Sequence, residues 1–200
     1  IACWFDLLSP AEREALLQAS VFRGGFALEA AAGVIRTGAG APPLLDLLEG
    51  LRDKSLLRLE GGRFRLYESV REFAAAQLAA AGGLADAEER HATFFVAAAE
   101  AWAEATTGPS GVEASGMLQA DRENLLAAFE RSFAAQPGRA ARIGLALAAG
   151  LALHGPIAAE LELVDRALDA ARRAGDAPLL ARILCARGAA YTRQGRTAEA

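Results

Sequence analysis

The sequence predicts a mainly α-helical protein with one β-hairpin, in which antiparallel helix pairs follow an N-terminal domain. Composition is the first observation: 53% of the 200 residues are hydrophobic but only 6% are aromatic, which favours helices packed through small side chains. The second observation is the alternation of apolar and polar residues around Gly61-Gly62, which is the pattern of two half-buried strands. The third is a series of glycine and proline breaks that divides the chain after residue 82 into helix-length segments.

Three helices are expected before the hairpin. The motif Ser9-Pro10-Ala11-Glu12 is a capping box with proline at the first helical position, and it predicts a helix over 10–19. The apolar residues within 4–8 are interpreted as packed against this helix. A second, short helix is predicted over 28–35, and a third over 44–54 with leucines at helical spacing.

Residues 57–66 form the predicted hairpin. A two-residue turn at Gly61-Gly62 requires positive φ, which glycine adopts without steric cost, and this turn fixes the register. The resulting pairs are Leu57 with Leu66 and Leu59 with Phe64 on an apolar face, and Arg58 with Arg65 and Glu60 with Arg63 on a charged face. A lone ribbon buries too little surface to be stable, so its apolar face should pack on the flanking helices. Three helices followed by this hairpin predict a winged-helix domain over residues 1–81.

Helices make up the rest of the predicted structure. The segments expected to be helical are 68–81, 86–106, 117–134, 139–154, 157–174 and 177–194, with a surface loop over 107–116. Residues 82–136 are interpreted as a helical linker. Gly188, Tyr191, Gly195 and Ala200 have the small-aromatic-small spacing of a tetratricopeptide repeat (TPR), and Gly155 lies 40 residues before Gly195. We therefore interpret residues 137–200 as the start of a TPR-like α-solenoid.

Charge and composition argue against several classes of protein. The 21 basic and 25 acidic residues give a net charge of -4, which argues against a protein that mainly binds phosphate backbones. The two cysteines, Cys3 and Cys185, form no disulfide framework or zinc pattern, which fits a reducing compartment. No apolar run reaches the length of a membrane span and no signal peptide is recognisable, so we expect a cytoplasmic protein with no membrane partner. Because the chain begins at Ile1 rather than Met and stops inside a predicted helix, we expect it to be a fragment of a longer protein.

No catalytic or metal site is expected in this chain. The phosphate-binding motif GxxxxGK[ST] does not occur, so we expect no nucleotide-hydrolysing site. Ser9 is better explained as a helix cap than as a nucleophile, because no nucleophile elbow surrounds it. His91 and His154 have no second ligand at metal spacing, and we expect both to be structural.

Five motifs, in this order along the chain, resemble a known family. They are WFDLLSPAEREALLQASVFRGGFALEAA, LLDLLEGLRDKSLL, GRFRLYESVREFAAAQL, ERHATFFVAAAE and ADRENLLAAFE. From Trp4 to Arg131 the chain is similar to the region that follows the nucleotide-binding domain in bacterial STAND-class ATPase regulators, which are related to NB-ARC proteins. In that family a P-loop ATPase precedes a winged helix, a helical linker and a TPR-type array.

The resemblance implies a signalling switch, often in transcriptional control. In such regulators the ADP-bound form is closed, and a ligand or partner that binds the repeats releases it. The implied partners are the nucleotide-binding domain of the same polypeptide and an unknown protein or small ligand at the repeats. ATP or ADP would be the cofactor of the full-length protein, with no cofactor in this chain.

Tyr67 is the candidate cofactor-binding residue that the resemblance suggests. In NB-ARC relatives the winged helix supplies a Met-His-Asp motif whose histidine touches the ADP phosphate, and the matching positions here are Leu66-Tyr67-Glu68. The tyrosine hydroxyl can donate a hydrogen bond to a phosphate, but it carries no switchable charge near neutral pH. The alternative interpretation is a packed or surface tyrosine at the base of the hairpin.

Arg58, Arg63 and Arg65 are the candidate nucleic-acid contacts, because they cluster on the charged face of the hairpin. The third predicted helix would have to read the DNA, and it carries Asp46, Glu49 and Asp53 beside Arg52 and Lys54. We therefore do not expect this fragment to contact DNA.

We interpret the chain as a non-catalytic regulatory and protein-interaction fragment. Its function would be to couple partner binding at the helical repeats to a nucleotide-binding domain outside this chain. Two alternatives stay open: a DNA-binding winged-helix module, and a stand-alone TPR-like scaffold. A DNA-binding module should bind duplex DNA with a steep salt dependence, whereas a scaffold should bind its partner regardless of nucleotide.

Overall fold

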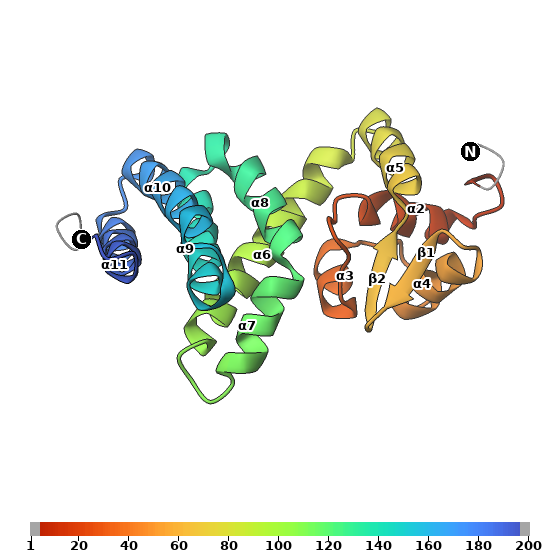
Figure 1. The fold of residues 1–200 in the computed structure, drawn as a ribbon. Helices are drawn as coiled ribbons and strands as arrows, with labels where there is room; N and C mark the ends of the chain where they lie inside the picture. Colours follow the sequence, from red (N-terminus) through yellow and green to blue (C-terminus); the bar gives the residue numbers. More distant parts are fainter. Residues whose placement is uncertain (1–4, 197–200) are drawn as a thin grey trace. The chain divides into compact units, whose positions relative to one another are not determined.

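The computed structural model describes residues 5–196, which contain ten helices and one two-stranded antiparallel sheet (Figure 1). The predicted class, mainly helical with a single hairpin, is confirmed for these residues. Trp4 of the predicted apolar lead-in and Ala200 of the predicted repeat spacing lie outside them, as does the side chain of His154. The chain forms two compact units: unit 1 ends at Phe94 and unit 2 begins at Phe95, inside helix α6 (Leu84–Ala105). The predicted boundaries at residues 81 and 136 stay a prediction.

Unit 1 contains the helices α2 (Pro10–Ala19), α3 (Leu28–Val34), α4 (Leu44–Asp53) and α5 (Glu68–Ala80), all within a residue of their predicted bounds. The capping box at the start of α2 is confirmed. The Glu12 amide donates to Ser9 Oγ at 3.3 Å, and the Ser9 amide donates back to Glu12 Oε2 at 2.9 Å. These bonds satisfy two amides that a helix start otherwise leaves without partners. Helix α2 packs against both α4 and α5, so its start fixes the centre of the unit.

The hairpin consists of β1 (Leu57–Glu60) and β2 (Arg63–Leu66), and its register is the predicted one. Gly61 and Gly62 have φ of 56° and 77°, as the tight turn requires. A third backbone pairing was not predicted: Phe26, between α2 and α3, exchanges two hydrogen bonds of 2.8 Å with Phe64. Strand β2 therefore lies between Phe26 and β1.

The prediction that the apolar face of the hairpin is buried is only partly right. Phe64 and Leu57 are buried, and Phe64 stacks on Phe26 with ring centres 6.0 Å apart. Leu59, directly opposite Phe64, remains 46% exposed. Phe64 is covered because β2 is the central strand, whereas Leu59 lies on the edge strand next to the turn.

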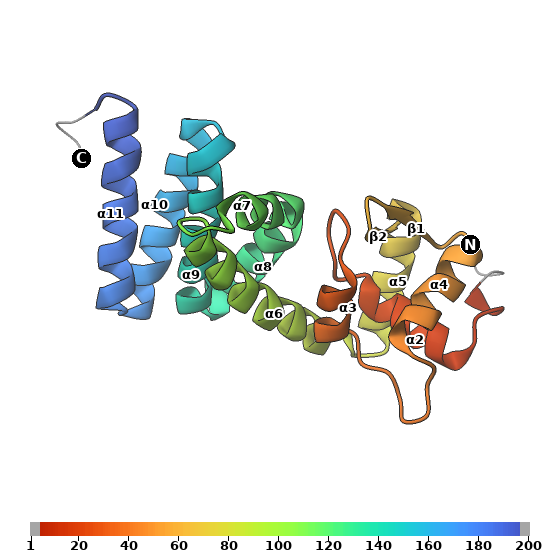
Figure 2. The same ribbon diagram turned by 90° about the horizontal axis from the view of Figure 1, so that it is seen from below.

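Unit 2 contains the second half of α6 together with α7 (Gly111–Ala120), α8 (Arg122–Ala135), α9 (Pro137–His154), α10 (Ile157–Ala174) and α11 (Ala177–Arg193). Helices α9, α10 and α11 run side by side (Figures 1 and 2). Alternate helices also touch, since α9 contacts both α7 and α11. Gly144 of α9 lets the neighbouring helices approach closely: a Cβ there would lie 2.8 Å from Ala167 Cβ of α10 and 3.0 Å from the Phe129 ring of α8.

Two neighbouring segments differ from the prediction. The loop expected over 107–116 becomes helical at Gly111, and the single helix expected over 117–134 is two helices that meet at Asp121. Asp121 is buried, and its Oδ1 accepts a hydrogen bond of 2.9 Å from Asn124 Nδ2, also buried, which stabilises the break between α7 and α8. Glycine and serine content indicated a loop where Gly111 in fact begins a helix.

Candidate functional site

Tyr67 lies at the residue immediately before α5, with its ring 44% exposed. The guanidinium carbon of Arg58 lies 5.5 Å from the centre of that ring, a cation–π contact. Among residues 5–196 nothing hydrogen-bonds the Tyr67 hydroxyl, so it is open to a ligand. The next residue, Glu68, accepts a hydrogen bond from Arg71, which lowers the pKa of this carboxyl and keeps it charged. Phosphate sensing by Tyr67 stays a prediction, and the neighbouring carboxylate would repel a phosphate.

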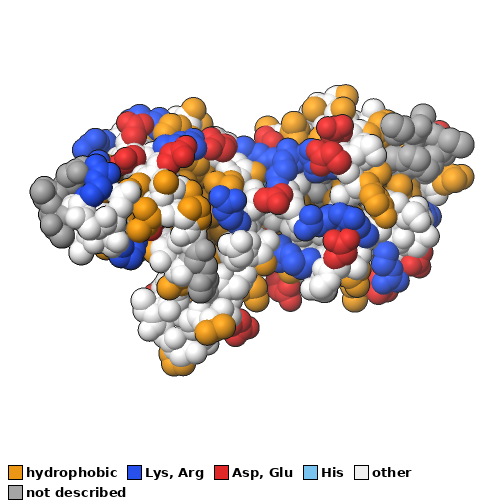
Figure 3. Space-filling view, in the orientation of Figure 1, with side chains coloured by type: hydrophobic (Ala, Val, Ile, Leu, Met, Phe, Trp, Pro, Cys, Tyr) orange, Lys and Arg blue, Asp and Glu red, His pale blue; other side chains and the backbone are white. Residues whose placement is uncertain are grey.

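The three candidate nucleic-acid contacts lie on one face of the hairpin and already have partners. Glu60 lies 3.2 Å from Arg58 and 3.8 Å from Arg65, and Arg63 donates to the Gly25 carbonyl at 3.1 Å. Figure 3 shows basic side chains beside acidic ones on the face of unit 1 that carries the hairpin. A phosphate would have to compete with these bonds for each guanidinium.

The basic residues of helix α4 also form ion pairs within the protein. Arg52 lies 3.8 Å from Glu49 and 3.1 Å from Asp53, and Lys54 is paired with Glu12 of α2. These intramolecular pairs reduce the positive potential that DNA binding requires. That this chain does not contact DNA stays a prediction.

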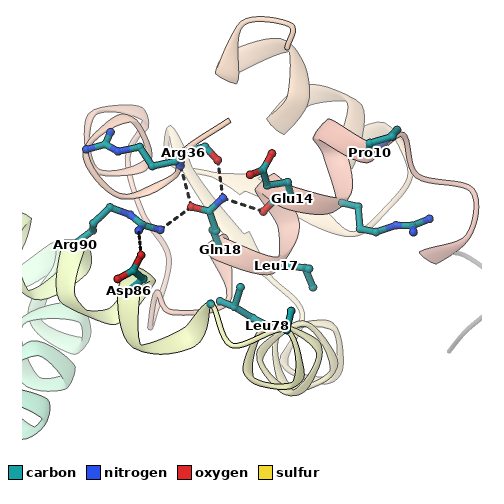
Figure 4. Close-up of a pocket in the computed structure, with 11 residues that line it drawn as sticks. Pro10, Glu14, Leu17, Gln18, Arg36, Leu78, Asp86 and Arg90 are labelled. Atoms are coloured by element: carbon teal, nitrogen blue, oxygen red, sulfur yellow. Dashed lines mark hydrogen bonds and ion pairs between the residues drawn. The ribbon is translucent and has the colours of Figure 1, made fainter. Parts of the chain in front are cut away.

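A buried polar cluster joins α2, the end of α3 and the first half of α6 (Figure 4). Gln18 is 6% exposed, and its Nε2 donates to the Arg36 carbonyl at 2.6 Å while its Oε1 accepts from the Arg36 amide at 2.9 Å. Arg90 completes the cluster, since Nη2 donates to Gln18 Oε1 at 2.8 Å and Nε donates to the Val34 carbonyl at 2.7 Å. The Gln18 amide is thus fully bonded, and it holds α6 to unit 1.

A groove of about 530 Å³ lies beside this cluster, within unit 1. Leu17 and Leu78 form an apolar part of its lining, and Glu14, Arg36 and Asp86 add charged groups. Figure 4 shows Gln18 turned toward Arg36 and Arg90 rather than offered to a ligand. The cluster therefore organises the helices of unit 1.

A larger groove, of about 890 Å³, lies in unit 2 between the second half of α6, α9 and α11. We refer to it as the α6–α9–α11 groove. It is lined by Glu100, Ala103, Glu104, Leu145, Ala149, Ala181, Arg182 and Cys185. A small cavity of about 30 Å³ adjoins it and adds Arg142 to the lining.

The charges of the α6–α9–α11 groove are only partly paired. Arg142 Nη1 lies 3.9 Å from Glu100 Oε2, and both side chains are close to half exposed. Such a long, hydrated ion pair contributes little to stability. Arg182 makes no hydrogen bond or ion pair with any residue between 5 and 196. The lining therefore combines apolar surface with guanidinium groups that can accept a new partner.

Sequence reasoning missed both grooves. Their residues come from helices far apart along the chain, such as Gln18 and Arg90, and no local pattern connects them. One signal was present, however. The tripeptide Ala141-Arg142-Ile143 recurs 40 residues later as Ala181-Arg182-Ile183, the same interval as between Gly155 and Gly195.

The groups with shifted pKa belong to ion pairs outside the grooves. Arg166 of α10 donates two hydrogen bonds of 2.7 Å to Glu130 of α8, and these lower the pKa of the glutamate. Arg166 also lies over the rings of Phe129 and Phe133, so the pair ties α8 to α10. These shifts mark structural ion pairs rather than an acid and base placed around a substrate.

No family model, no curated protein and no solved structure matches this chain. No helix within residues 5–196 is long and apolar enough to cross a membrane. No group of three or more His, Cys, Asp or Glu among the same residues is arranged to hold a metal ion.

Proposed function

We propose that this chain is a non-catalytic regulatory and protein-interaction part of a STAND-type signal-transducing ATPase. Unit 1 would be its winged helix, and the helix pairs of unit 2 would begin a TPR-like array. The chain would couple partner binding at the array to a nucleotide-binding domain encoded elsewhere in the same polypeptide. The observation that carries the proposal is the order of elements in unit 1.

The element order of unit 1 supports the winged-helix proposal. A first helix, α2, is followed by the Phe26 pairing, then by α3 and α4, and then directly by the β1–β2 hairpin. A winged helix needs a third strand position beside its two-stranded wing, and Phe26 supplies a one-residue equivalent. This feature was not used to infer the resemblance from the sequence, so it supports the proposal independently.

The array rests on a repeat between α9 and α11. At an interval of 40 residues the two helices share Ala141/Ala181, Arg142/Arg182, Ile143/Ile183, Ala146/Ala186, Ala149/Ala189 and the glycines Gly155/Gly195. Ile143 and Ile183 are both fully buried, so this pair has the same orientation in each helix, whereas Ala141 is buried and Ala181 is exposed. Contacts between alternate helices are what stacked helix pairs produce, because each pair packs on the next.

Helix α6 offers a route for coupling. One uninterrupted helix contributes residues 84–94 to unit 1 and residues 95–105 to unit 2. Arg90 bonds it to the buried cluster of unit 1, and Glu100 bonds it to α9 of unit 2. The proposal is that a ligand-induced change in the second half of α6 also affects its first half, because both belong to one hydrogen-bonded helix.

The decisive test of the switch is the reading frame upstream of Ile1 in the source gene. The proposal predicts a GxxxxGK[ST] motif about 200 to 300 residues before Ile1, the size of one nucleotide-binding domain. With that motif present, Tyr67→Phe in the full-length protein should weaken ADP retention if the hydroxyl touches the phosphate. A frame without the motif would sink the nucleotide-switch proposal and leave a helical scaffold.

A further inference from the structure

The repeat between α9 and α11 places one arginine of each helix on the same groove. Arg142 and Arg182 are equivalent residues at the 40-residue interval, and each immediately precedes a fully buried isoleucine. Both line the small cavity that adjoins the α6–α9–α11 groove, together with Leu145 and Glu100. Two equivalent arginines, one in the groove lining and both in the lining of the adjoining cavity, offer two points of contact for carboxylates, because guanidinium binds carboxylate through paired hydrogen bonds.

Neither guanidinium is firmly engaged. Arg182 has no ion pair or hydrogen bond within the described chain, residues 5–196. Arg142 Nε donates a hydrogen bond of 3.3 Å to the Gly138 carbonyl, and its one ion-pair partner there is Glu100, at 3.9 Å, with exposed side-chain fractions of 45% and 41%. By contrast, Arg166 in the same unit holds Glu130 through two bonds of 2.7 Å. The groove pair can therefore be exchanged for a ligand carboxylate, whereas the α8–α10 pair cannot be exchanged so readily.

The lining between the arginines is apolar. Leu145 and Ala149 of α9 and Ala181 of α11 leave half-buried or exposed hydrocarbon surface in the groove, and Ala103 of α6 faces them. Small side chains at three of these positions leave room for the side chains of a ligand. A ligand that covers this surface and also reaches the arginines needs apolar groups and carboxylates in alternation.

We infer that the α6–α9–α11 groove binds an acidic peptide segment, whose carboxylates pair with Arg142 and Arg182 and whose apolar side chains cover Leu145 and Ala149. In the free protein Glu100 occupies part of this site, and the ligand displaces it from Arg142. Glu104, one turn later on α6, repels the ligand carboxylates and confines them to the side of α9 and α11. The inference rests on the proposed function, since it names the class of partner that the array takes.

The test uses residues 1–200 and a fluorescein-labelled peptide in which aspartate alternates with leucine, titrated by fluorescence anisotropy. Arg182→Gln should weaken binding by about tenfold, the loss expected for one charge-assisted contact. Glu100→Gln should tighten binding severalfold, because it frees Arg142. Arg172→Gln, on an exposed residue of α10 outside the groove, should leave the affinity unchanged and serves as the matched control. Added salt should weaken the wild-type complex.

Cys185 supplies a second readout that does not depend on the charge variants. It is an exposed thiol in the groove lining, and Cys3→Ser leaves it as the only cysteine. The aspartate–leucine peptide should slow maleimide labelling of Cys185. A peptide in which lysine replaces aspartate should slow it far less.

Three results would overturn the inference: equal affinity for the aspartate and lysine peptides, an affinity of Arg182→Gln equal to that of Arg172→Gln, or Cys185 labelling that the aspartate peptide does not slow. The titration needs only this chain, whereas the nucleotide switch is tested by the upstream reading frame. Peptide binding without an upstream phosphate-binding motif would support the proposed peptide site and contradict the nucleotide switch. An upstream motif without peptide binding would support the nucleotide switch and contradict the proposed peptide site.

Discussion

Helix α6 makes two polar junctions, one in each unit, and they differ in kind. In unit 1, Arg90 reaches the buried amide of Gln18 and the Val34 carbonyl through bonds of 2.8 and 2.7 Å. In unit 2, Glu100 reaches Arg142 through one half-exposed contact of 3.9 Å. A buried, fully bonded junction stabilises the fold, because breaking it strands polar groups away from water. A hydrated one can exchange partners at small cost. The contrast indicates which end of α6 is fixed and which can respond to a ligand.

Disruption of the unit 1 junction should cause the largest loss of stability. Gln18→Ala removes the acceptor of the Arg36 amide and of Arg90, and the donor to the Arg36 carbonyl. We expect it to lower the free energy of unfolding by about 2–4 kcal/mol, the cost of leaving several buried polar groups without partners. Urea denaturation checks this, with the exposed Gln77→Ala on α5 as the matched control. Equal, small losses for the two variants would mean that the cluster is not a fixed anchor.

The stability of unit 2 should depend on helix packing rather than on the Glu100–Arg142 ion pair. Gly144→Val would place new methyl groups where a Cβ already lies 2.8 Å from Ala167 Cβ and 3.0 Å from the Phe129 ring. We expect a loss of about 1–3 kcal/mol from overpacking. Gly116→Val is the control, because a Cβ at Gly116 meets nothing within 4 Å. A thermal melt in which the two variants coincide would contradict the close packing of α8, α9 and α10.

The Glu130–Arg166 pair should give a smaller, pH-dependent effect. Hydrogen bonds from Arg166 lower the pKa of Glu130 below its ordinary value of 4.5. A carboxylate with a lowered pKa in the folded state contributes stability above its unfolded pKa, and that contribution is lost as the pH falls through the folded pKa. Glu130→Gln should therefore cost about 0.5–1 kcal/mol at pH 7 and less at about pH 3, because the contribution decreases as the pH falls below 4.5. Unfolding curves at both pH values test this, with the exposed Glu123→Gln as control; a pH-independent difference would refute the assigned cause.

The smallest effect is expected at the unit 2 junction. In a double-mutant cycle of Glu100→Gln and Arg142→Gln, the coupling energy for stability should be no more than about 0.5 kcal/mol. The same Glu100→Gln variant should nevertheless tighten binding of the acidic peptide. A coupling energy comparable to the loss of unfolding free energy in Gln18→Ala would mean that both junctions stabilise the fold. This result would contradict the proposed difference between them.

Local signals explain what could be predicted from the sequence. The capping box at Ser9 determines the start of α2, and the two glycines at Gly61-Gly62 determine the hairpin register, because both depend on neighbouring residues only. The Phe26–Phe64 pairing joins residues 38 positions apart, and the Gln18–Arg90 bond joins residues 72 apart, so no local pattern contains them. The break at Asp121 depends on burial of its carboxylate, which composition does not report.

The candidate site was predicted less well than the fold. Arg58, Arg63, Arg65 and Tyr67 were chosen by residue type and by resemblance, but the availability of a charge depends on its partners, which only the structure supplies. Arg182 differs from the hairpin arginines in that respect, because it lacks a partner within residues 5–196, whereas Arg142 has a long ion pair with Glu100 and a hydrogen bond to the Gly138 carbonyl. The 40-residue repeat that relates them is visible in the sequence once α9 and α11 are aligned.

The coupling itself is tested most directly by amide hydrogen exchange along α6 with the aspartate–leucine peptide at saturation. If α6 transmits the displacement of Glu100, exchange should change in residues 95–105, which belong to unit 2, and also in residues 84–94, which belong to unit 1. The Gln18→Ala variant should lose the second change and keep the first, since the anchor of α6 in unit 1 is gone. Exchange that changes only around the groove, with residues 84–94 unaffected in the wild type, would contradict the proposed coupling.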